Sequence, residues 1–394
     1  MTTINKSAKI LVIGGSSLDT LTIKGKDHSS PGGAGLYTAL AAAKSGADVT
    51  LLAPFPSPVP ATLLEFSAHV KWIGPEVSPD ELPRFHIVHA NGETKYKRSF
   101  FGAEGAMTAE DLPDDFSEYD LVHLVPLGNT IKQLEFINIC RKRNAELISA
   151  GTGKPLIEQE PGLVKDVIQA SDIFFMNEEE ANAVFPENTE FRFATGKHIF
   201  VTKGKNGASV FLGEYQYLLD PKQVNVLDPT GAGDAFCGAT ISGIAQGEHP
   251  VKAAMSASVL ASEVIKAVGP EKLYIKSKIR TNKINARVLV NHDQVQQTAK
   301  LISGFEAEKP YNFIDSTLPP LTHPLTVEYF FVTVLQQFSF WSSREKHYHL
   351  PLISEIGGNE LKGAFYLFMA YKQKLDEDPN FFLAERQAEL TLNE

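Results

Sequence analysis

A short run of small residues flanked by aspartates is the part of this chain best suited to chemistry. Residues 228–234 read Asp-Pro-Thr-Gly-Ala-Gly-Asp. Gly231, Ala232 and Gly233 follow a predicted strand and open a predicted helix, so their backbone N–H groups form a site for phosphate oxygens. Asp234, in the first turn of that helix, could take a proton from a hydroxyl nucleophile. An anion site beside a base is what phosphoryl transfer to an alcohol requires, although a glycine-rich turn capped by Asp234 is a structural alternative.

The same segment resembles the signature of the PfkB/ribokinase family of ATP-dependent sugar and nucleoside kinases, whose pattern is close to D-[TP]-T-G-A-G-D. The resemblance implies that Asp234 is the catalytic base and that the backbone of residues 231–233 is the anion hole. It implies ATP and Mg²⁺ as cofactors. It also places Asp228 and Thr230 by the phosphates and leaves open a site for a monovalent cation, potassium, beside them.

Several positions near the start of the chain resemble the family's acceptor site. Asp19 follows the first predicted strand, where a carboxylate could accept hydrogen bonds from two sugar hydroxyls, and Gly32 and Gly33 would let a sugar approach the backbone closely. A turn aspartate and tight helix packing are the structural alternatives. Tyr37 stands where ribokinases have an asparagine that contacts the sugar, and the stretch 19–32 is short for a complete lid. Both departures leave the identity of the acceptor open.

Asn177 and Glu180 match the family's N-x-x-E motif, which positions magnesium and phosphate largely through water. Magnesium prefers oxygen ligands and keeps several waters, so one amide and one carboxyl group suffice. The structural alternative is a capping box, with Asn177 as N-cap and Glu180 at the third helical position. The two interpretations do not exclude each other.

A second glycine-containing loop resembles the family's T-x-G-x-x-G segment beside the nucleotide. It begins at Thr202 and contains Lys203, Gly204 and Gly207. The glycines would permit a turn and a close approach of the backbone, and Lys203 could face a phosphate. A surface turn with solvated lysines is the alternative.

These residues need a scaffold in which strands alternate with helices. Residues 9–15 form an apolar run ending in two glycines, typical of a buried central strand. Further strands are predicted at 47–53, 121–127, 146–149, 173–176 and 198–202. Helices are predicted at 33–45, 130–143, 155–170 and 178–184. The alternation favours an α/β fold with a doubly wound, mostly parallel sheet, as the ribokinase resemblance implies, and ligands in such sheets bind beyond the carboxyl ends of the strands.

Residues 84–100 interrupt the alternation. Two extended stretches flank Asn91-Gly92, a pair typical of a tight β-hairpin turn. In the ribokinase-like fold a small β-lid covers the sugar, and this hairpin could form part of it. A lid would expel water, so that the phosphoryl group reaches the acceptor and not solvent. An ordinary surface hairpin is the alternative.

Composition narrows the class of partner. The formal net charge is −10 and the pI is near 5.6, which argues against nucleic acid or an anionic membrane and leaves a small molecule. The two cysteines, Cys140 and Cys237, make no disulfide framework. A polar start without a secretory pattern and the lack of a spanning apolar run complete the expectation of a cytoplasmic protein.

The character of the chain changes after Gly269. We expect a kinase-like domain over 1–280 and a mainly helical module over 281–394. Part of this module, which includes 323–332 and 337–341, weakly resembles the queuosine-salvage N-glycosidases. The leading hypothesis is a kinase that phosphorylates a primary hydroxyl of a sugar or nucleoside. A bifunctional salvage protein with a glycosidase-like module and a non-catalytic regulator on a kinase scaffold are the alternatives. Oligomeric state stays open, with a homodimer through the lids as one option that the resemblance offers.

Overall fold

The computed structural model of the chain describes residues 7–90, 93–185, 197–212, 215–274 and 286–289. The chain divides into two compact units, and the first contains 1–193, 197–211 and 218–286. The fold and the site described below belong to this first unit. The domain boundary expected near residue 280 stays a prediction. The helical module expected over 281–394 lies outside the described residues, apart from the short strand β16 (Ala286–Leu289).

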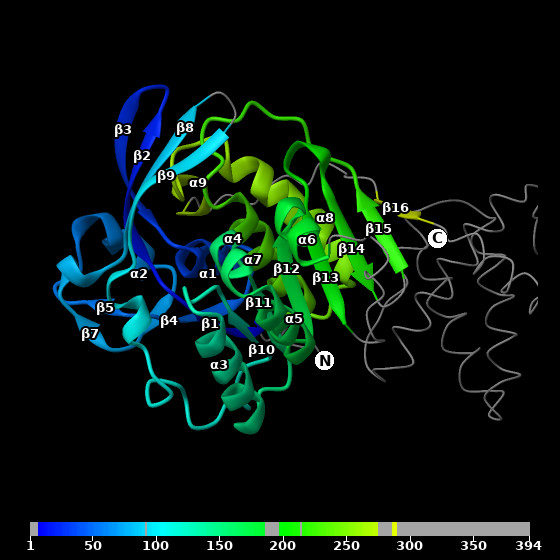
Figure 1. Ribbon diagram of the computed structural model, residues 1–394, viewed down its shortest axis with the longest axis horizontal. Helices are drawn as coiled ribbons and strands as arrows, with labels where there is room; N and C mark the ends of the chain where they lie inside the picture. Colours follow the sequence, from blue (N-terminus) through cyan, green and yellow to red (C-terminus); the bar gives the residue numbers. More distant parts are fainter. Residues whose placement is uncertain (1–6, 91–92, 186–196, 213–214, 275–285, 290–394) are drawn as a thin grey trace, which may run out of the picture. The chain divides into compact units, whose positions relative to one another are not determined.

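A large, mostly parallel sheet forms the centre of the first unit (Figure 1). Eight neighbouring strands of this sheet run in the order β14, β13, β12, β11, β10, β1, β4 and β6. Their bounds are β1 (Lys9–Ile13), β4 (Asp48–Leu52), β6 (Lys71–Ile73), β10 (Leu121–Leu124), β11 (Ile148–Gly151), β12 (Ile173–Asn177), β13 (His198–Thr202) and β14 (Ala208–Leu212). The pairings from β13 through β6 are all parallel.

Strand β1 lies where the strand order of this sheet reverses. Its residues from Ile10 to Ile13 are wholly buried, as in a parallel strand that is covered on both faces. Leu11 lies level with Val122 of β10 on one side and with Thr50 of β4 on the other. Because the strand order reverses around β1, the loops at its carboxyl end leave the sheet in opposite directions and open a crevice.

Helices pack on both faces of the sheet (Figure 1). The longer ones are α1 (Ala34–Lys44), α3 (Thr130–Lys142), α5 (Pro161–Ala170), α6 (Glu178–Val184), α7 (Ala232–Ala245) and α8 (Pro250–Val264). Short ones are α2 (Leu64–Ser67), α4 (Lys154–Gln159) and α9 (Glu271–Tyr274). Helices α1 and α7 approach closely where Gly238 faces Thr38. A Cβ on Gly238 would lie only 2.1 Å from the Thr38 carbonyl oxygen, so glycine is needed there. This close contact fixes the start of α7, which carries the signature segment.

A separate four-stranded sheet forms the lid, in the order β3, β2, β8, β9. Its strands are β2 (Ser17–Ile23), β3 (Lys26–Gly32), β8 (Arg84–Ala90) and β9 (Glu93–Phe100). The antiparallel pairing of β8 with β9 confirms the expected hairpin, whose Asn91-Gly92 turn lies outside the described residues. Lys24 and Gly25, both left-handed, close β2 onto β3 in a tight turn. The stretch 19–32 therefore supplies half of the lid although it is short.

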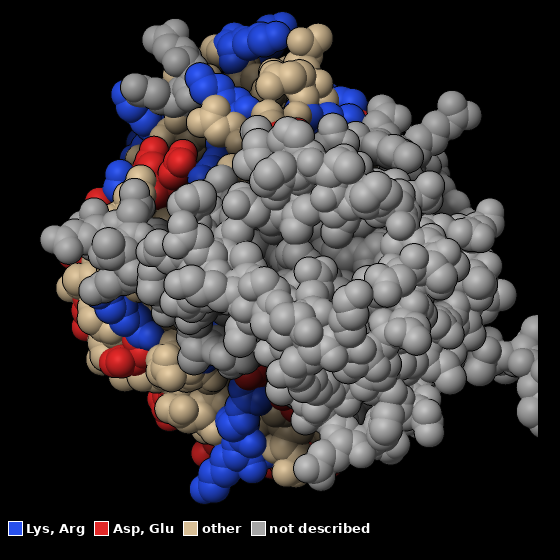
Figure 2. Space-filling model, turned by 90° about the vertical axis from the view of Figure 1, so that its right-hand side faces the viewer, with Lys and Arg blue, Asp and Glu red and all other residues tan. Residues whose placement is uncertain are grey.

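The lid carries positive charge on an otherwise acidic protein. Its exposed side chains include Lys24, Lys26, Lys95, Lys97 and Arg98. Figure 2 shows blue side chains at the top of the view, the end at which the lid lies in Figure 1. Such a local field attracts anions to the edge of the crevice even though the whole chain is negative.

Three local expectations differ from the structure. The helix expected over 155–170 is two helices, because Pro161 lacks an N–H donor and begins α5 as its first residue. Asp19 lies within β2 and not in a turn after the first strand. The signature segment does not follow a strand directly, since an extended stretch without strand pairing separates it from β15 (Tyr215–Leu219). The remaining short elements are β5 (Phe55–Pro56), β7 (Glu76–Val77), η1 (Ala61–Leu63), η2 (Pro79–Glu81), η3 (Gly102–Ala106) and η5 (Gly204–Asn206).

Candidate active site

The start of α7 is built to receive an anion. Gly231 is the N-cap of the helix, with φ 73°, and no side chain caps the helix start. The Ala232 N–H donates to the Pro229 carbonyl oxygen over 3.3 Å. The other N–H groups of the first turn, which includes Gly233, have no acceptor in a preceding turn of the helix. The partial positive charge at this end of the helix adds to their attraction for phosphate oxygens.

Asp234 lies in that first turn and is half-buried. Burial raises the pKa of its carboxyl group to about 6. Its charge reaches neighbouring groups. Burial first and then the Asp234 charge raise the pKa of Glu180 to about 7, and the same two causes raise the pKa of Tyr96. The Tyr96 hydroxyl also feels Asp19. The charges of three carboxyl groups therefore act on the hydroxyl group of Tyr96, a lid side chain that is 63% exposed.

Asp228 stabilises the loop of residues 229–233, called the anion loop below. Its side chain is completely buried, and its Oδ1 accepts a hydrogen bond of 2.9 Å from the Thr230 N–H. Its Oδ2 accepts one of 2.8 Å from the Gly269 N–H, so it ties the loop to the segment after α8. His89 of the lid adds a contact to Thr230, which the sequence did not predict. The expected cation site at Asp228 and Thr230 stays a prediction.

Asn177 and Glu180 form the capping box that the sequence offered as an alternative. The Glu180 N–H donates to Asn177 Oδ1 over 2.9 Å, and the Asn177 N–H donates to Glu180 Oε2 over 2.8 Å. Glu180 is only 9% exposed. Among the residues that the structure describes, no three His, Cys, Asp or Glu side chains form a metal cluster. The magnesium role of this pair stays a prediction.

Asp19, Gly32 and Gly33 lie together at the base of the lid. Asp19 is 4% exposed, and its Oδ1 accepts a hydrogen bond of 3.2 Å from the Phe85 N–H. A Cβ on Gly32 would lie 1.9 Å from Asp19 Oδ2, so Gly32 makes room for the carboxylate. Gly33, the N-cap of α1 with φ 94°, packs against the Gly15 carbonyl oxygen. Burial raises the pKa of Asp19 to about 6.

Aromatic rings of the lid lie beside this carboxylate. Phe85 of β8 makes edge-to-face contacts with Tyr96 at 6.1 Å and with Phe101 at 5.5 Å between ring centroids. Tyr96 and Phe101 are 63% and 52% exposed, so the cluster presents aromatic surface on the side of the lid that carries Asp19.

Tyr37 packs directly behind the anion loop. It is 1% exposed, and a Cβ on Gly231 would lie 2.2 Å from Tyr37 Cδ1. The ring fills the space left by the missing side chain of Gly231 and so supports the loop. Its expected contact with the acceptor stays a prediction.

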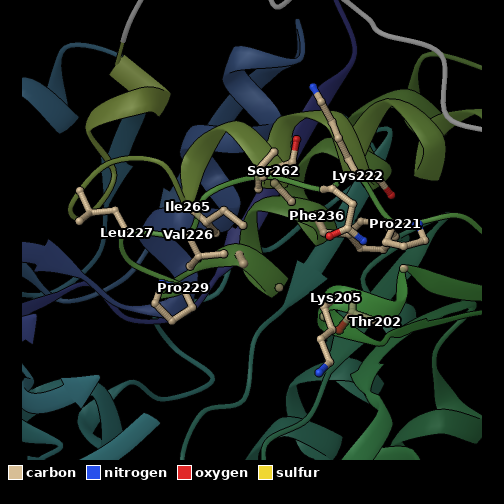
Figure 3. A pocket seen from close by; sticks show the side chains of 18 of the residues that line it. Thr202, Lys205, Pro221, Lys222, Val226, Leu227, Pro229, Phe236, Ser262 and Ile265 are labelled. Carbon is tan, nitrogen blue, oxygen red and sulfur yellow. The ribbon is translucent and has the colours of Figure 1, made fainter. Parts of the chain in front are cut away.

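A cavity of about 700 Å³ opens beside the anion loop, on the side of Ala232 and Gly233 (Figure 3). Thr202, Gly204 and Gly207 line it, as the sequence predicted for a nucleotide loop. Lys203 does not line it, whereas Lys205 does, because the 3₁₀ turn η5 carries residue 205 to the cavity side. The volume suits a drug-sized or nucleotide-sized ligand.

The opposite wall of the cavity is apolar and was missed by sequence reasoning. Figure 3 shows Val226, Pro229 and Ile265 facing Thr202 and Lys205 across the space. Residues 221–227 have no strand pairing, and Ile265 follows α8, so neither gave a periodic signal. The lid residues His89 and Thr94 also line the cavity. An apolar slot with a few polar groups at one end fits a flat base with an anionic tail.

Comparisons with known proteins match the part of the chain that carries this site. A family model described as pfkB family carbohydrate kinase matches residues 12–278. The cytidine kinase of Thermococcus kodakarensis is 25% identical over 66% of this chain and 97% of its own, and the ribokinase of Bacillus subtilis is 25% identical over 61% and 86%.

Solved structures share the fold. A probable sugar kinase from Rhizobium etli superimposes with a TM-score of 0.60 at 18% identity, covering 67% of this chain and 94% of its own. Adenosine kinase from Sinorhizobium meliloti gives 0.58 at 17% identity, covering 67% and 96%. In the described part of the chain, none of the helices has the length and apolarity needed to span a membrane. The family match ends before the C-terminal region, so its glycosidase resemblance stays a prediction. The chain belongs to the pfkB family of carbohydrate kinases and has the ribokinase-like fold of that family's sugar and nucleoside kinases.

Proposed function

We propose that the protein transfers the γ-phosphoryl group of ATP to a primary hydroxyl group of a sugar or nucleoside, with Asp234 as general base. The observation that carries the proposal is the position of Asp234, one residue after the uncapped N–H groups of the anion loop and within electrostatic reach of Tyr96 and Glu180. A carboxyl group with a pKa of about 6 is ionised at neutral pH and basic enough to accept a proton as the hydroxyl attacks.

The proposed transfer forms one bond to the γ-phosphorus and breaks one. The acceptor oxygen forms a bond to the γ-phosphorus while the bond from that phosphorus to the bridging oxygen of ADP breaks, and the hydroxyl proton passes to Asp234. The N–H groups of Gly231 and Gly233 receive the negative charge of the transferring group, and the Ala232 N–H joins them when it turns from the Pro229 carbonyl oxygen, 3.3 Å away. Asp19 orients the acceptor through other hydroxyl groups. The lid keeps water away from the phosphoryl group.

ATP fits the cavity beside the loop, with its base in the apolar slot and its phosphates toward Ala232 and Gly233. Magnesium, when bound, would neutralise charge on the nucleotide phosphates. Asn177 and Glu180 suit a contact through water, because their direct hydrogen bonds already close the capping box.

Potassium has a poorer fit. Both oxygens of Asp228 already accept backbone hydrogen bonds, and His89 Nε2 lies 3.3 Å from Oδ1. We therefore propose transfer without a required monovalent cation. Equal rates in potassium and in tetramethylammonium buffers would support this, and strict dependence on potassium would contradict it.

A panel of sugars and nucleosides with ATP, followed by ADP formation and by mass spectrometry of the phosphorylated product, tests the proposal. Asp234→Asn should lower kcat on the best acceptor by at least about 10²-fold, while ADP-induced stabilisation persists. The exposed Asp166 of α5 provides the matched control Asp166→Asn, which should keep wild-type turnover. Wild-type turnover in Asp234→Asn would refute the role of the base.

The remaining alternatives use the same preparation. If no compound of the panel is phosphorylated, a non-catalytic regulator is favoured. Release of free base from nucleosides or their 5′-phosphates would favour the alternative of a glycosidase in residues 281–394. A homodimer through the lids is a further proposal that sedimentation measures directly. Two unpaired, buried cysteines suit work in the reducing cytoplasm.

A further inference from the structure

His89 joins the lid to the anion loop by direct hydrogen bonding. Its Nε2 lies 2.8 Å from Thr230 Oγ1 and 3.3 Å from Asp228 Oδ1. Its Nδ1 lies 3.0 Å from Thr94 Oγ1, on the neighbouring lid strand. The imidazole side chain is 9% exposed. The His89 ring, which belongs to β8, therefore contacts the neighbouring lid strand β9 and two residues of the signature segment.

The partners of His89 determine its tautomer. Burial lowers the pKa of His89 against the opposing effect of Asp228, so the ring is neutral and carries one N–H group. A carboxylate oxygen only accepts, so the proton belongs on Nε2, the nitrogen beside Asp228. Nδ1 then accepts from the Thr94 hydroxyl. Thr230 Oγ1 accepts from His89, which leaves the Thr230 hydroxyl proton free to point toward an anion at the loop.

The strand that carries His89 also contacts the acceptor side. Alternate residues of β8 face the same way, and Phe85, Ile87 and His89 form one such row. The Phe85 N–H donates to Asp19, while His89 bonds Thr230 at the other end of the row. Between them Ile87 packs in an apolar cluster that includes Leu227 of the loop segment. A single lid strand thus spans from the acceptor carboxylate to the phosphate loop.

We infer that His89 is a positioning residue for phosphoryl transfer. When the lid lies on the anion loop, the Nε2–H group of His89 holds the Thr230 hydroxyl group and the Asp228 carboxylate in place. The anion loop and the acceptor are then aligned with each other. The inference rests on the proposed kinase function. It assigns the chemical link between lid closure and the anion site to one side chain.

The test compares His89→Ala and His89→Gln in the full-length protein with a matched lid variant. Glutamine places an amide nitrogen near the position of Nε2 and should keep the bond to Thr230. His86→Ala is the control, since His86 bonds Thr22 over 2.9 Å within the lid and has no hydrogen bond to the loop. His89→Ala should lower kcat and kcat/KM together by about 3- to 10-fold, the worth of a neutral hydrogen bond. His89→Gln should recover most of this loss, and His86→Ala should show none.

A double-variant cycle with Thr230→Val separates positioning from general lid damage. If His89 acts through Thr230, the double variant should be no slower than Thr230→Val alone. Additive losses, a kcat of His89→Ala equal to that of His86→Ala, or failure of glutamine to recover activity would each overturn the inference.

Failure of the His89 inference can be distinguished from failure of the proposed kinase function. If Asp234→Asn is inactive and His89→Ala is normal, only the positioning role fails. If the wild-type protein phosphorylates nothing, the rise in Tm caused by ADP replaces turnover as the readout. His89→Ala and Thr230→Val should then each reduce that rise, and the double variant should reduce it no further, whereas additive reductions would reject the link.

Discussion

The ring of Tyr37 lies where any residue other than glycine at position 231 would place its side chain. A Cβ on Gly231 would come within 2.2 Å of Tyr37 Cδ1 and 2.3 Å of Cε1. Gly231 also has φ 73°, a left-handed conformation that L-amino acids adopt at a cost. Helix α1, which carries Tyr37, therefore sets the position of the anion loop from behind, and the loop can keep its shape only with glycine at this point.

Gly231→Ala should consequently disturb both stability and activity. The strained φ alone costs about 1 kcal/mol, and the clash with an immobile buried ring adds to it. We expect a lower Tm and a fall in kcat of at least about 10-fold, because N–H groups of the loop would move from their positions by a fraction of an ångström. Thermal unfolding and steady-state kinetics measure the two effects.

Gly233→Ala is the matched control for this substitution. A Cβ there would meet no heavy atom within 4 Å, and Gly233 lies within α7. Its Tm should be unchanged or slightly higher, since alanine is the better helix former. An equal loss of Tm in both variants would contradict the packing argument.

Tyr37→Phe separates support of the loop from contact with the acceptor. The Tyr37 hydroxyl is buried and has no hydrogen-bond partner among the described residues. Removing an unsatisfied buried hydroxyl relieves a desolvation cost of about 1–3 kcal/mol, whereas the ring and its packing remain. The variant should be at least as stable as the wild type in urea unfolding, with unchanged kcat/KM. A large rise in the acceptor KM would instead restore the contact that the sequence suggested.

The sequence predicted the strands and helices well where local chemistry decides them. The run around Ile10–Ile13 is apolar enough to be only a buried strand, and the capping box at Asn177 and Glu180 is readable from two residues three positions apart. The glycine-rich start of α7 is equally local, because conformation and missing side chains are properties of the residues themselves.

What could not be predicted depends on contacts between distant segments. Tyr37 sits in an alanine-rich helix, and only the crossing of α1 over α7 shows that its ring packs against Gly231. His89 is one of two histidines in the hairpin, and its bond to Thr230 joins residues 141 positions apart. The choice between Lys203 and Lys205 depends on a single 3₁₀ turn, which no periodic pattern encodes.

Those two lysines give a direct test of the nucleotide cavity. Lys205 lines it and Lys203 does not, although both lie in one short loop. Lys205→Ala should raise the KM for ATP by several-fold, most clearly at low salt, because a partly exposed cation attracts phosphate weakly and is screened. Lys203→Ala serves as the control with the same change of charge. Equal effects of both would indicate a general electrostatic contribution and would contradict the assigned cavity wall.

The pH dependence of the reaction should follow the base. Asp234 accepts a proton only when ionised, and its pKa is about 6, so kcat/KM should be level above pH 7 and should fall about tenfold per unit well below pH 6. Glu180, with a pKa of about 7, could produce a similar limb. Measuring the profile in Glu180→Gln distinguishes them: a limb that stays near pH 6 belongs to Asp234, and a limb that disappears would assign the titration to Glu180.

Glu104 should make the folded protein less stable as the pH rises. This residue of η3 accepts a hydrogen bond of 2.9 Å from the Gly15 N–H, and burial raises its pKa from 4.5 to about 7. Between these values the folded state holds a proton that the unfolded state has lost. The free energy of unfolding therefore declines as pH rises from about 4.5 to 7 and stays low above that.

Glu104→Gln removes the buried charge and keeps an acceptor for Gly15. It should raise the free energy of unfolding at pH 8 by about 2 kcal/mol and flatten its decline between pH 5 and 7. At pH 4, where the wild-type carboxyl group is protonated, the two proteins should be nearly equal. The exposed Glu110 gives the control Glu110→Gln, which should leave the urea-unfolding profile unchanged at every pH. A destabilised Glu104→Gln at pH 8 would mean that the carboxylate is ionised in a favourable contact, contrary to the burial argument.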